Sequence, residues 1–284
     1  MNKHLLITGS TGYLGSYITD LFLKNNYKIL CTVHNDGLSL GYLQNYPNNL
    51  NFIDVDEKSF ANKIKQFNPN LIIHTAARYE NNSATVEEIM DSNLYFPLRL
   101  LNIVLECDTK PLWINTNTSL PKMLNTYSLS KVQFAEWGKY YSLKNKIDFT
   151  DILLEQFYGP NDSGSKFFPF LLSKMEKGED INLTDGLQKR DIIYVDDVIN
   201  AFLLIAESRL EGYNLVPLGT GIAPRIRDIV EELNQLLGYP SNLKFGAIEK
   251  RENEPDILVA DISKLKEIGF VPKVHWQDGL KKII

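Results

Sequence analysis

Short hydrophobic runs alternate with longer amphipathic stretches over the first 157 residues of the chain. The runs predict β-strands at residues 4–8, 28–33, 51–55, 70–75, 112–116 and 149–157. The stretches between them predict helices at residues 13–25, 57–67, 86–106 and 127–144. Such alternation is typical of an α/β fold, and right-handed crossovers place helices on both faces of the sheet. We therefore predict a doubly wound parallel sheet.

The pattern changes after Gly159-Pro160, where the loops become longer. Helices are expected there at residues 168–177, 196–207, 226–237 and 262–267. Segments 191–204 and 214–218 are expected to return to the main sheet. The remainder predicts a smaller C-terminal α/β lobe.

Composition narrows the class of protein. The chain has 284 residues, 44% of them hydrophobic, and a net charge of −5. Its basic residues are dispersed, so we expect no nucleic-acid or membrane partner. No apolar run approaches the roughly 18 residues that a membrane span needs. The two cysteines favour a reducing cytoplasm, and the four histidines show no metal-ligand spacing.

A glycine-rich segment, Thr8–Gly15, follows the first hydrophobic run directly. Gly9 permits a tight turn, Gly12 lets a phosphate approach the backbone, and Gly15 lets the next helix lie close to the strand. The start of that helix offers unpaired N–H groups to an anion. We predict a dinucleotide-binding domain at residues 1–160 with about 191–219, and a substrate lobe at residues 161–190 and 220–284.

The end of the second strand bears on the choice of nicotinamide cofactor. His34 and Asn35 follow the strand and can donate hydrogen bonds to a 2′-phosphate, which favours NADP(H). The first acidic residue there is Asp36, which would select NAD if it reached the ribose. Asp54, at the end of the third strand, is a candidate acceptor for the adenine amino group; the alternative is a turn cap.

Tyr127 and Lys131 are separated by one helical turn and therefore face the same way. A neighbouring ammonium favours the phenolate, so we expect Lys131 to lower the pKa of Tyr127. Such a phenol can exchange a proton with a carbonyl or hydroxyl oxygen. Tyr140 and Lys144 have the same spacing, but their distance from the preceding strand favours a surface or packing role.

A third catalytic group would be a hydroxyl that hydrogen-bonds the substrate oxygen. Thr116, at the carboxyl end of its predicted strand, is the first candidate and Thr118 the second. The alternative for either threonine is a cap on the following turn.

Together these motifs resemble the extended short-chain dehydrogenase/reductase family, in its sugar-nucleotide epimerase/dehydratase branch, which has a Rossmann fold. The resemblance covers nearly the whole chain. Its motifs are the glycine loop Thr8–Gly15, His74-Thr75-Ala76-Ala77, Ser92-Asn93-Leu94, the triad Thr116, Tyr127 and Lys131, Tyr158-Gly159-Pro160 and Arg190–Asp197. Residues 115–131 resemble the CDP-abequose and CDP-paratose synthases, which implies NADPH-dependent reduction of a 4-keto-deoxysugar for cell-surface polysaccharide.

The resemblance also implies binding roles for individual residues. Those expected at the cofactor are Gly9, Thr11, Gly12, Tyr13, Leu14, Gly15, His34, Asn35, Asp54, Val55, Ala76, Ala77, Asn93, Tyr127 and Lys131. Those expected at the nucleotide sugar are Arg78, Thr118, Gln156, Lys166, Phe167, Arg190, Arg251 and Glu254. Among the latter, the two arginines Arg190 and Arg251 would hold the diphosphate and Glu254 the ribose, while Gln156 stands where the family often has Asn.

Departures from the family pattern limit the reaction. Asn117 and Thr118 stand where a 4,6-dehydratase carries Asp-Glu, and neither side chain performs that proton transfer. Two alternatives to a 4-ketoreductase stay open: an NAD-dependent 4-epimerase, and a non-catalytic redox-sensing protein on the same scaffold.

Two predicted helices carry apolar residues on more than one face: Phe96, Leu100, Leu101, Phe134, Trp137 and Tyr141. Core packing explains some of them. In the resembled family such helices form a four-helix bundle between two subunits, so a homodimer is expected.

Overall fold

The computed structural model describes residues 3–34, 49–80, 84–162, 166–250 and 252–284. Its contacts divide the chain into two compact units. Unit 1 comprises residues 1–153 and 201–216, and unit 2 comprises residues 154–200 and 217–284. The assignment of a cofactor-binding and a substrate-binding role to two lobes stays a prediction.

Unit 1 is built on a sheet that has seven strands within the described residues, in the order β11-β6-β5-β4-β1-β2-β3. The strands are β1 (His4–Thr8), β2 (Lys28–Val33), β3 (Leu50–Asp54), β4 (Leu71–His74), β5 (Leu112–Thr118), β6 (Asp148–Leu154) and β11 (Tyr213–Leu218). The order reverses between β1 and β4, the position at which ligands bind in doubly wound sheets. The predicted fold class is confirmed.

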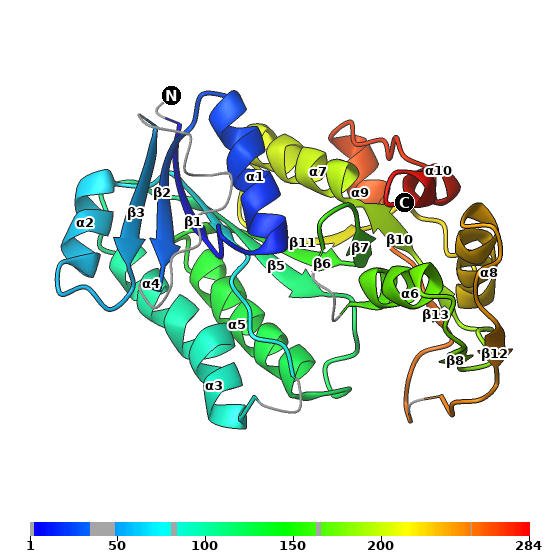
Figure 1. Ribbon diagram of the computed structural model, residues 1–284. Helices are drawn as coiled ribbons and strands as arrows, with labels where there is room; N and C mark the ends of the chain where they lie inside the picture. The colour runs from blue at the N-terminus through cyan, green and yellow to red at the C-terminus, as the bar shows by residue number, and fades with distance from the viewer. Residues whose placement is uncertain (1–2, 35–48, 81–83, 163–165, 251) are drawn as a thin grey trace. The chain divides into compact units, whose positions relative to one another are not determined.

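Helices cover both faces of this sheet (Figure 1). They are α1 (Tyr13–Lys24), α2 (Phe60–Phe67), α3 (Val86–Met90), η2 (Asp91–Tyr95), α4 (Phe96–Val104) and α5 (Thr126–Leu143). Helices α2, α4 and α5 share a core with the sheet that includes Ile64, Leu101, Trp113 and Phe134, each 1% exposed or less. Helix α1 packs on β1 and β2 from the opposite face.

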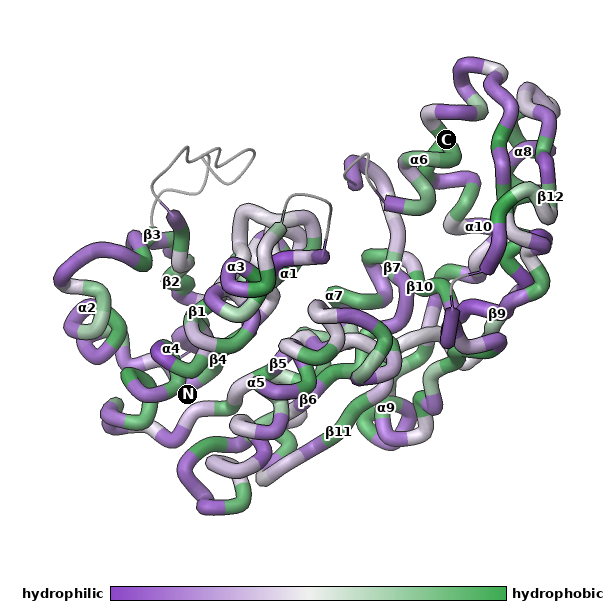
Figure 2. The backbone as a smooth tube through the Cα atoms, turned by 90° about the horizontal axis from the view of Figure 1, so that it is seen from below, coloured by the Kyte–Doolittle hydropathy of each residue, from purple (hydrophilic) through white to green (hydrophobic). Residues whose placement is uncertain are grey.

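Parallel pairing aligns the carboxyl ends of the strands at one edge. Thr8 pairs with Thr32 on one side and with His74 on the other, and His74 pairs with Asn115. The residues that follow these strands therefore lie along one edge. Strand β2, which has a neighbour on each side, is mainly hydrophobic after its first residue (Figure 2), as expected of a strand buried on both faces.

Unit 2 contains three two-stranded ladders among the described residues, β7–β10, β8–β12 and β9–β13. Its strands are β7 (Gln156–Tyr158), β8 (Ile181–Leu183), β9 (Lys189–Arg190), β10 (Ile192–Tyr194), β12 (Leu243–Phe245) and β13 (Ile257–Leu258). Its helices are α6 (Phe167–Glu176), α8 (Ile226–Leu236), α9 (Ser263–Glu267) and α10 (Trp276–Lys281); α7 (Val195–Ser208) belongs partly to each unit.

Three predicted elements differ from the structure. The predicted strand 149–157 is two strands. β6 pairs with β11 in the main sheet, up to the bond from the N–H of Glu155 to the carbonyl of Leu218, whereas β7 pairs with β10. Segment 191–204 does not join the main sheet, whereas 214–218 does, within β11. The predicted helix 86–106 contains the π-helical turn η2, followed by Pro97, which has no N–H to donate.

Candidate active site

The glycine loop fits a dinucleotide pyrophosphate. Gly9 has a φ of +72°, and a Cβ there would lie 2.7 Å from the backbone nitrogen of Ala76. A Cβ on Gly15 would lie 2.0 Å from the carbonyl oxygen of Gly9. Gly12 caps α1, donates its N–H to Gly9 at 3.0 Å and is exposed. Because the first turn of α1 has no acidic residue, the helix N-terminus is open to an anion.

The other predicted cofactor residues lie along the same strand edge. Thr11 is exposed, and Tyr13 and Leu14 begin α1. His34 follows β2 with its side chain 69% exposed, and its Nδ1 is 3.8 Å from a carboxylate oxygen of Asp56. Asn35 and Asp36 lie outside the described residues, as does Arg251. Val55 is buried after β3, and Ala76 and Ala77 follow β4.

Asp54 makes the turn that the sequence analysis named as its alternative role. Its Oδ1 accepts a hydrogen bond from the backbone N–H of Asp56 at 2.9 Å. A contact of the same carboxylate with adenine stays a prediction.

Asn93 links the loop after β4 to helix α5. Its side chain accepts from the N–H of Arg78 at 2.7 Å and donates to that residue's carbonyl at 2.9 Å. It also donates to Oγ of Ser130 at 3.0 Å, and Ser130 donates to the carbonyl of Tyr127 at 2.8 Å. Asn93 is fully buried. It therefore holds the start of α5 in a fixed position against β4.

Helix α5 begins directly after Asn125, whose side chain caps it by accepting a hydrogen bond from the N–H of Ser128 at 2.8 Å. The helix packs against β5. Tyr127 and Lys131 follow in the first two turns. Thr116, on β5, has a buried hydroxyl oxygen with no hydrogen-bond partner among the described residues. Such an orphaned group fits a ligand oxygen. Thr118, in contrast, accepts from the N–H of Leu120 at 3.2 Å, as a turn residue does.

The pKa of Tyr127 is raised, whereas the sequence predicted that Lys131 would lower it. Burial raises this pKa well above its ordinary value, and the phenol of Tyr79, which accepts a hydrogen bond from Tyr127, raises it further. The two rings are stacked with centroids 4.7 Å apart. The expectation considered only the ammonium and omitted the loss of water around the phenol and the second tyrosine.

Lys131 is 2% exposed. Burial lowers its pKa to about 8, and the carboxylate of Asp151 partly opposes that shift. Tyr140, whose spacing to Lys144 imitates the pair, is 49% exposed and lies on the surface as expected.

The predicted substrate residues lie on elements of both unit 1 and unit 2. In unit 1, the guanidinium of Arg78 is 3.0 Å from a carboxylate oxygen of Glu88 and is partly exposed. In unit 2, Gln156 lies on β7, while Lys166 caps α6, pairs with Asp162 at 2.9 Å and lies over the ring of Phe157. Phe167, the first residue of α6, is half-buried.

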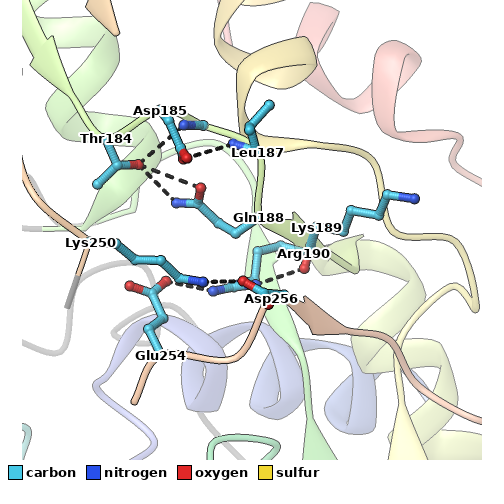
Figure 3. Close-up of polar contacts among 10 residues, drawn as sticks. Thr184, Asp185, Leu187, Gln188, Lys189, Arg190, Lys250, Glu254 and Asp256 are labelled. Atoms are coloured by element: carbon cyan, nitrogen blue, oxygen red, sulfur yellow. Dashed lines mark hydrogen bonds and ion pairs between the residues drawn. The ribbon is translucent and has the colours of Figure 1, made fainter. Parts of the chain in front are cut away.

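Unit 2 brings two of the predicted diphosphate and ribose ligands together (Figure 3). Nη2 of Arg190 is 2.5 Å from Oε1 of Glu254, and Nη1 donates to the carbonyl of Lys189 at 2.8 Å. Lys250 pairs with Asp256 beside them. The arginine is therefore oriented by a carboxylate and by a backbone carbonyl.

Two parts of this site were not predicted from the sequence. One is Tyr79, for which the sequence holds no signal beyond its aromatic side chain. The other is a buried polar cluster formed by Asn115, Asn117 and Asp151. Its signal was present: two asparagines alternate with Thr116 along one strand, and Asp151 interrupts a hydrophobic run.

Among the described residues no group of histidine, cysteine, aspartate and glutamate side chains could hold a metal ion. None of their helices has both the length and the apolar character that a membrane span requires.

Comparisons with known proteins agree with this geometry. The model of the NAD dependent epimerase/dehydratase family matches residues 5–216. A CDP-abequose synthase of Salmonella typhimurium is 28% identical over 300 residues, covering 100% of this chain and 98% of its own. A putative UDP-glucose 4-epimerase of Methanocaldococcus jannaschii is 23% identical, covering 99% and 97%.

The fold also matches a solved structure. The UDP-glucuronic acid 4-epimerase of Bacillus cereus, in complex with UDP-glucuronic acid and NAD, superposes with a TM-score of 0.86 at 22% identity. The match covers 98% of this chain and 97% of that one.

Proposed function

The chain belongs to the NAD dependent epimerase/dehydratase family, and from that premise we propose that it is an NADPH-dependent reductase of the 4-keto group of a CDP- or dTDP-linked deoxyhexose. That it is an NAD(P)-dependent sugar-nucleotide enzyme follows from its relatives. The observation that carries the finer proposal is the full-length similarity to CDP-abequose synthases, 27–29% identical in three cases.

The proposed reaction uses the residues at the end of β5 and the start of α5. A bound nicotinamide would supply hydride to C4 of the sugar. Tyr127 gives its phenolic proton to the C4 oxygen, so that the ketone becomes a secondary alcohol. The hydroxyl of Thr116, which has no partner of its own among the described residues, hydrogen-bonds the same oxygen and polarises the carbonyl. The buried ammonium of Lys131 holds the cofactor ribose and supports the phenolate.

We propose that Arg190 and Arg251 hold the diphosphate and that Glu254 contacts the nucleotide ribose. The orientation of Arg190 by Glu254 at 2.5 Å supports this assignment. Asn117 and Thr118 at the dehydratase positions support a reduction rather than an elimination of water.

NADPH is the proposed cofactor because His34 is an exposed hydrogen-bond donor directly after β2, and because the first acidic residue after this strand is Asp36. The solved neighbour carries NAD, so the preference needs a direct test. We propose a cytoplasmic protein of cell-surface polysaccharide synthesis, which accords with two free cysteines.

The second candidate is a 4-epimerase that retains NAD, favoured by the similarity to the putative UDP-glucose 4-epimerase. The two functions differ in their use of cofactor. An epimerase recycles its nicotinamide during each turnover, whereas a ketoreductase consumes one NADPH for each ketone reduced.

A substrate panel tests the proposal. The protein is incubated with NADPH or NADH and with CDP-, dTDP-, GDP- and UDP-linked 4-ketosugars, and nicotinamide absorbance is followed. We expect stoichiometric NADPH oxidation with a CDP- or dTDP-4-keto-deoxyhexose and a C4 alcohol by NMR. Faster turnover with NADH would refute the cofactor assignment.

A further inference from the structure

A carboxylate is buried in the middle of unit 1. Asp151 lies on β6, is 2% exposed and stands between fully buried apolar neighbours such as Phe149 and Ile152. Its Oδ1 accepts from the side-chain amide of Asn115 at 2.8 Å, and its Oδ2 accepts from that of Asn117 at 3.0 Å. Both asparagines are themselves 4% exposed or less. A charge so far from water is tolerated only when it is hydrogen-bonded and paired.

The cation that acts on this charge is the buried Lys131, although no direct ion pair joins the two side chains among the described residues. The lysine lies on α5, which packs against β5, the strand that carries both asparagines. Its ammonium and the carboxylate of Asp151 each favour the charged form of the other. Because burial opposes both charges, removing either one leaves the other uncompensated.

The other titratable groups near this pair are neutral. His74, from β4, is fully buried, and burial together with the charge of Lys131 holds its pKa well below the ordinary value. Burial and the charge of Asp151 raise the pKa of Tyr213, from β11, to about 12. The pKa of Tyr127 is raised by burial and by Tyr79. The negative charge that faces Lys131 is therefore that of Asp151.

We propose that Asp151, held by Asn115 and Asn117, is a positioning residue that keeps the ammonium of Lys131 charged and in place one helical turn from Tyr127. Its catalytic consequence rests on the proposed function, because that function gives Lys131 its role at the cofactor ribose. The electrostatic coupling between Asp151 and Lys131 does not depend on the substrate.

The electrostatic coupling between Asp151 and Lys131 can be measured in the absence of substrate. Protein labelled with ¹³C at the lysine ε-carbons is titrated by NMR, and Lys131→Arg assigns the resonance. In Asp151→Asn, the Lys131 titration moves to lower pH by about one unit, the lower end of the effect of a nearby opposite charge. Asp151→Glu, which keeps the charge, restores most of the original titration.

Thr150→Val is the matched control. Thr150 directly precedes Asp151 on β6 and is fully buried. Its hydroxyl has no hydrogen-bond partner among the described residues. The substitution changes a polar group of the same strand without removing a charge, so the titration of Lys131 stays in place. An equal shift in Thr150→Val and Asp151→Asn would overturn the proposal, as would an unchanged titration in Asp151→Asn.

The pH profile of ketone reduction gives the second readout. Activity needs protonated Lys131 and falls as the pH rises through its pKa, so the fall begins at lower pH in Asp151→Asn. If Asp151→Asn does not fold, Asn117→Ala replaces it in this test. That variant removes one hydrogen bond from the carboxylate of Asp151, so the titration of Lys131 moves to lower pH by a smaller amount. A shifted titration in a protein that reduces no ketosugar would refute the proposed function and leave the coupling intact.

Discussion

The proton donor proposed for this protein is a phenol that its surroundings keep protonated. Burial and Tyr79 both raise the pKa of Tyr127. A protonated phenol suits reduction, because the proton must be present when the C4 oxygen takes up charge. The nearby ammonium then acts on the phenolate that remains.

Replacing Tyr127 by Phe removes this proton and preserves the ring. We expect turnover to fall by about 100- to 10,000-fold while binding of nucleotide sugar is largely kept, since the loss is felt in the transition state. Steady-state rates and equilibrium binding on the same preparation check this. Turnover close to that of the parent protein would refute the role of Tyr127.

Replacing Tyr79 by Phe keeps the ring stack and removes the acceptor of the Tyr127 hydrogen bond. Two of the three causes that raise the pKa of Tyr127 disappear, so that pKa falls. The limb of the pH–rate profile that reports Tyr127 moves to lower pH. Tyr140→Phe, an exposed change on the same helix, is the control and leaves the profile in place.

Individual residues differ in how far the sequence can locate them. The glycines, Tyr127 and Lys131 stand in local motifs with fixed spacing, so their proximity follows from one strand, one turn or one helix. Tyr79 meets Tyr127 only through folding, 48 positions apart in the chain. Asp151 also comes within electrostatic reach of Lys131 only through folding, because the strand order brings β6 beside β5.

The buried His74 links two neighbouring strands, β1 and β4, at the edge where their carboxyl ends lie. Nδ1 of His74 lies 2.7 Å from the hydroxyl of Thr8. The ring packs among Phe96, Trp113 and Phe134. Protonation would place a charge in this apolar environment.

This histidine makes stability depend on pH. Its folded-state pKa lies well below 6.5, so the unfolded chain binds the proton more tightly. Its contribution is therefore complete above about pH 6.5 and is lost as the pH falls toward the folded-state pKa, at up to about 1.4 kcal/mol per pH unit. Urea unfolding between pH 8 and 5 measures this slope.

Two histidine variants isolate the effect. In His74→Gln the part of the slope due to this group disappears, whereas His34→Gln, an exposed change, retains it. An identical slope in His74→Gln and the parent protein would show that the proton is taken up elsewhere.

Asn93 joins η2 to α5 and to the loop after β4 through three polar atoms of its neighbours. Asn93→Ala removes the three hydrogen bonds of its side chain, so we expect a loss of about 1–3 kcal/mol in the free energy of unfolding. Denaturant unfolding measures it. Asn102→Ala, an exposed change on α4, should cost much less, and equal losses in the two variants would contradict the role of Asn93.

The element pattern was largely predictable because buried parallel strands are continuous hydrophobic runs. The π-helical turn was not, because residues 86–106 keep an ordinary helical periodicity and the departure depends on tertiary contacts of Asn93. The break between β6 and β7 was also hidden, since both strands lie in one hydrophobic run.

For the whole molecule we propose a homodimer. Three of the six residues that first suggested it, Leu100, Leu101 and Phe134, are buried in the core of unit 1 and carry no information on assembly. Three aromatic residues of η2 and α5 support it instead: Tyr95, Trp137 and Tyr140 are 46–58% exposed. Exposed aromatic side chains of this kind favour self-association.

Light scattering tests the assembly. The parent protein should have twice the chain mass, and Trp137→Glu should shift it to the monomer by placing a charge in the contact. Leu187→Glu, an exposed apolar residue of unit 2, is the control and should remain dimeric. A monomeric parent protein at micromolar concentration would contradict the proposal.

The most direct test of the central claim follows a labelled hydride. NADPH deuterated at C4 of the nicotinamide is incubated with a CDP-4-keto-deoxyhexose and the protein, and the product is analysed by NMR. The account predicts one deuterium at C4 of the sugar for each NADPH consumed. Ketosugar recovered unchanged without net oxidation of NADPH, or a C4 alcohol that carries no deuterium, would contradict it.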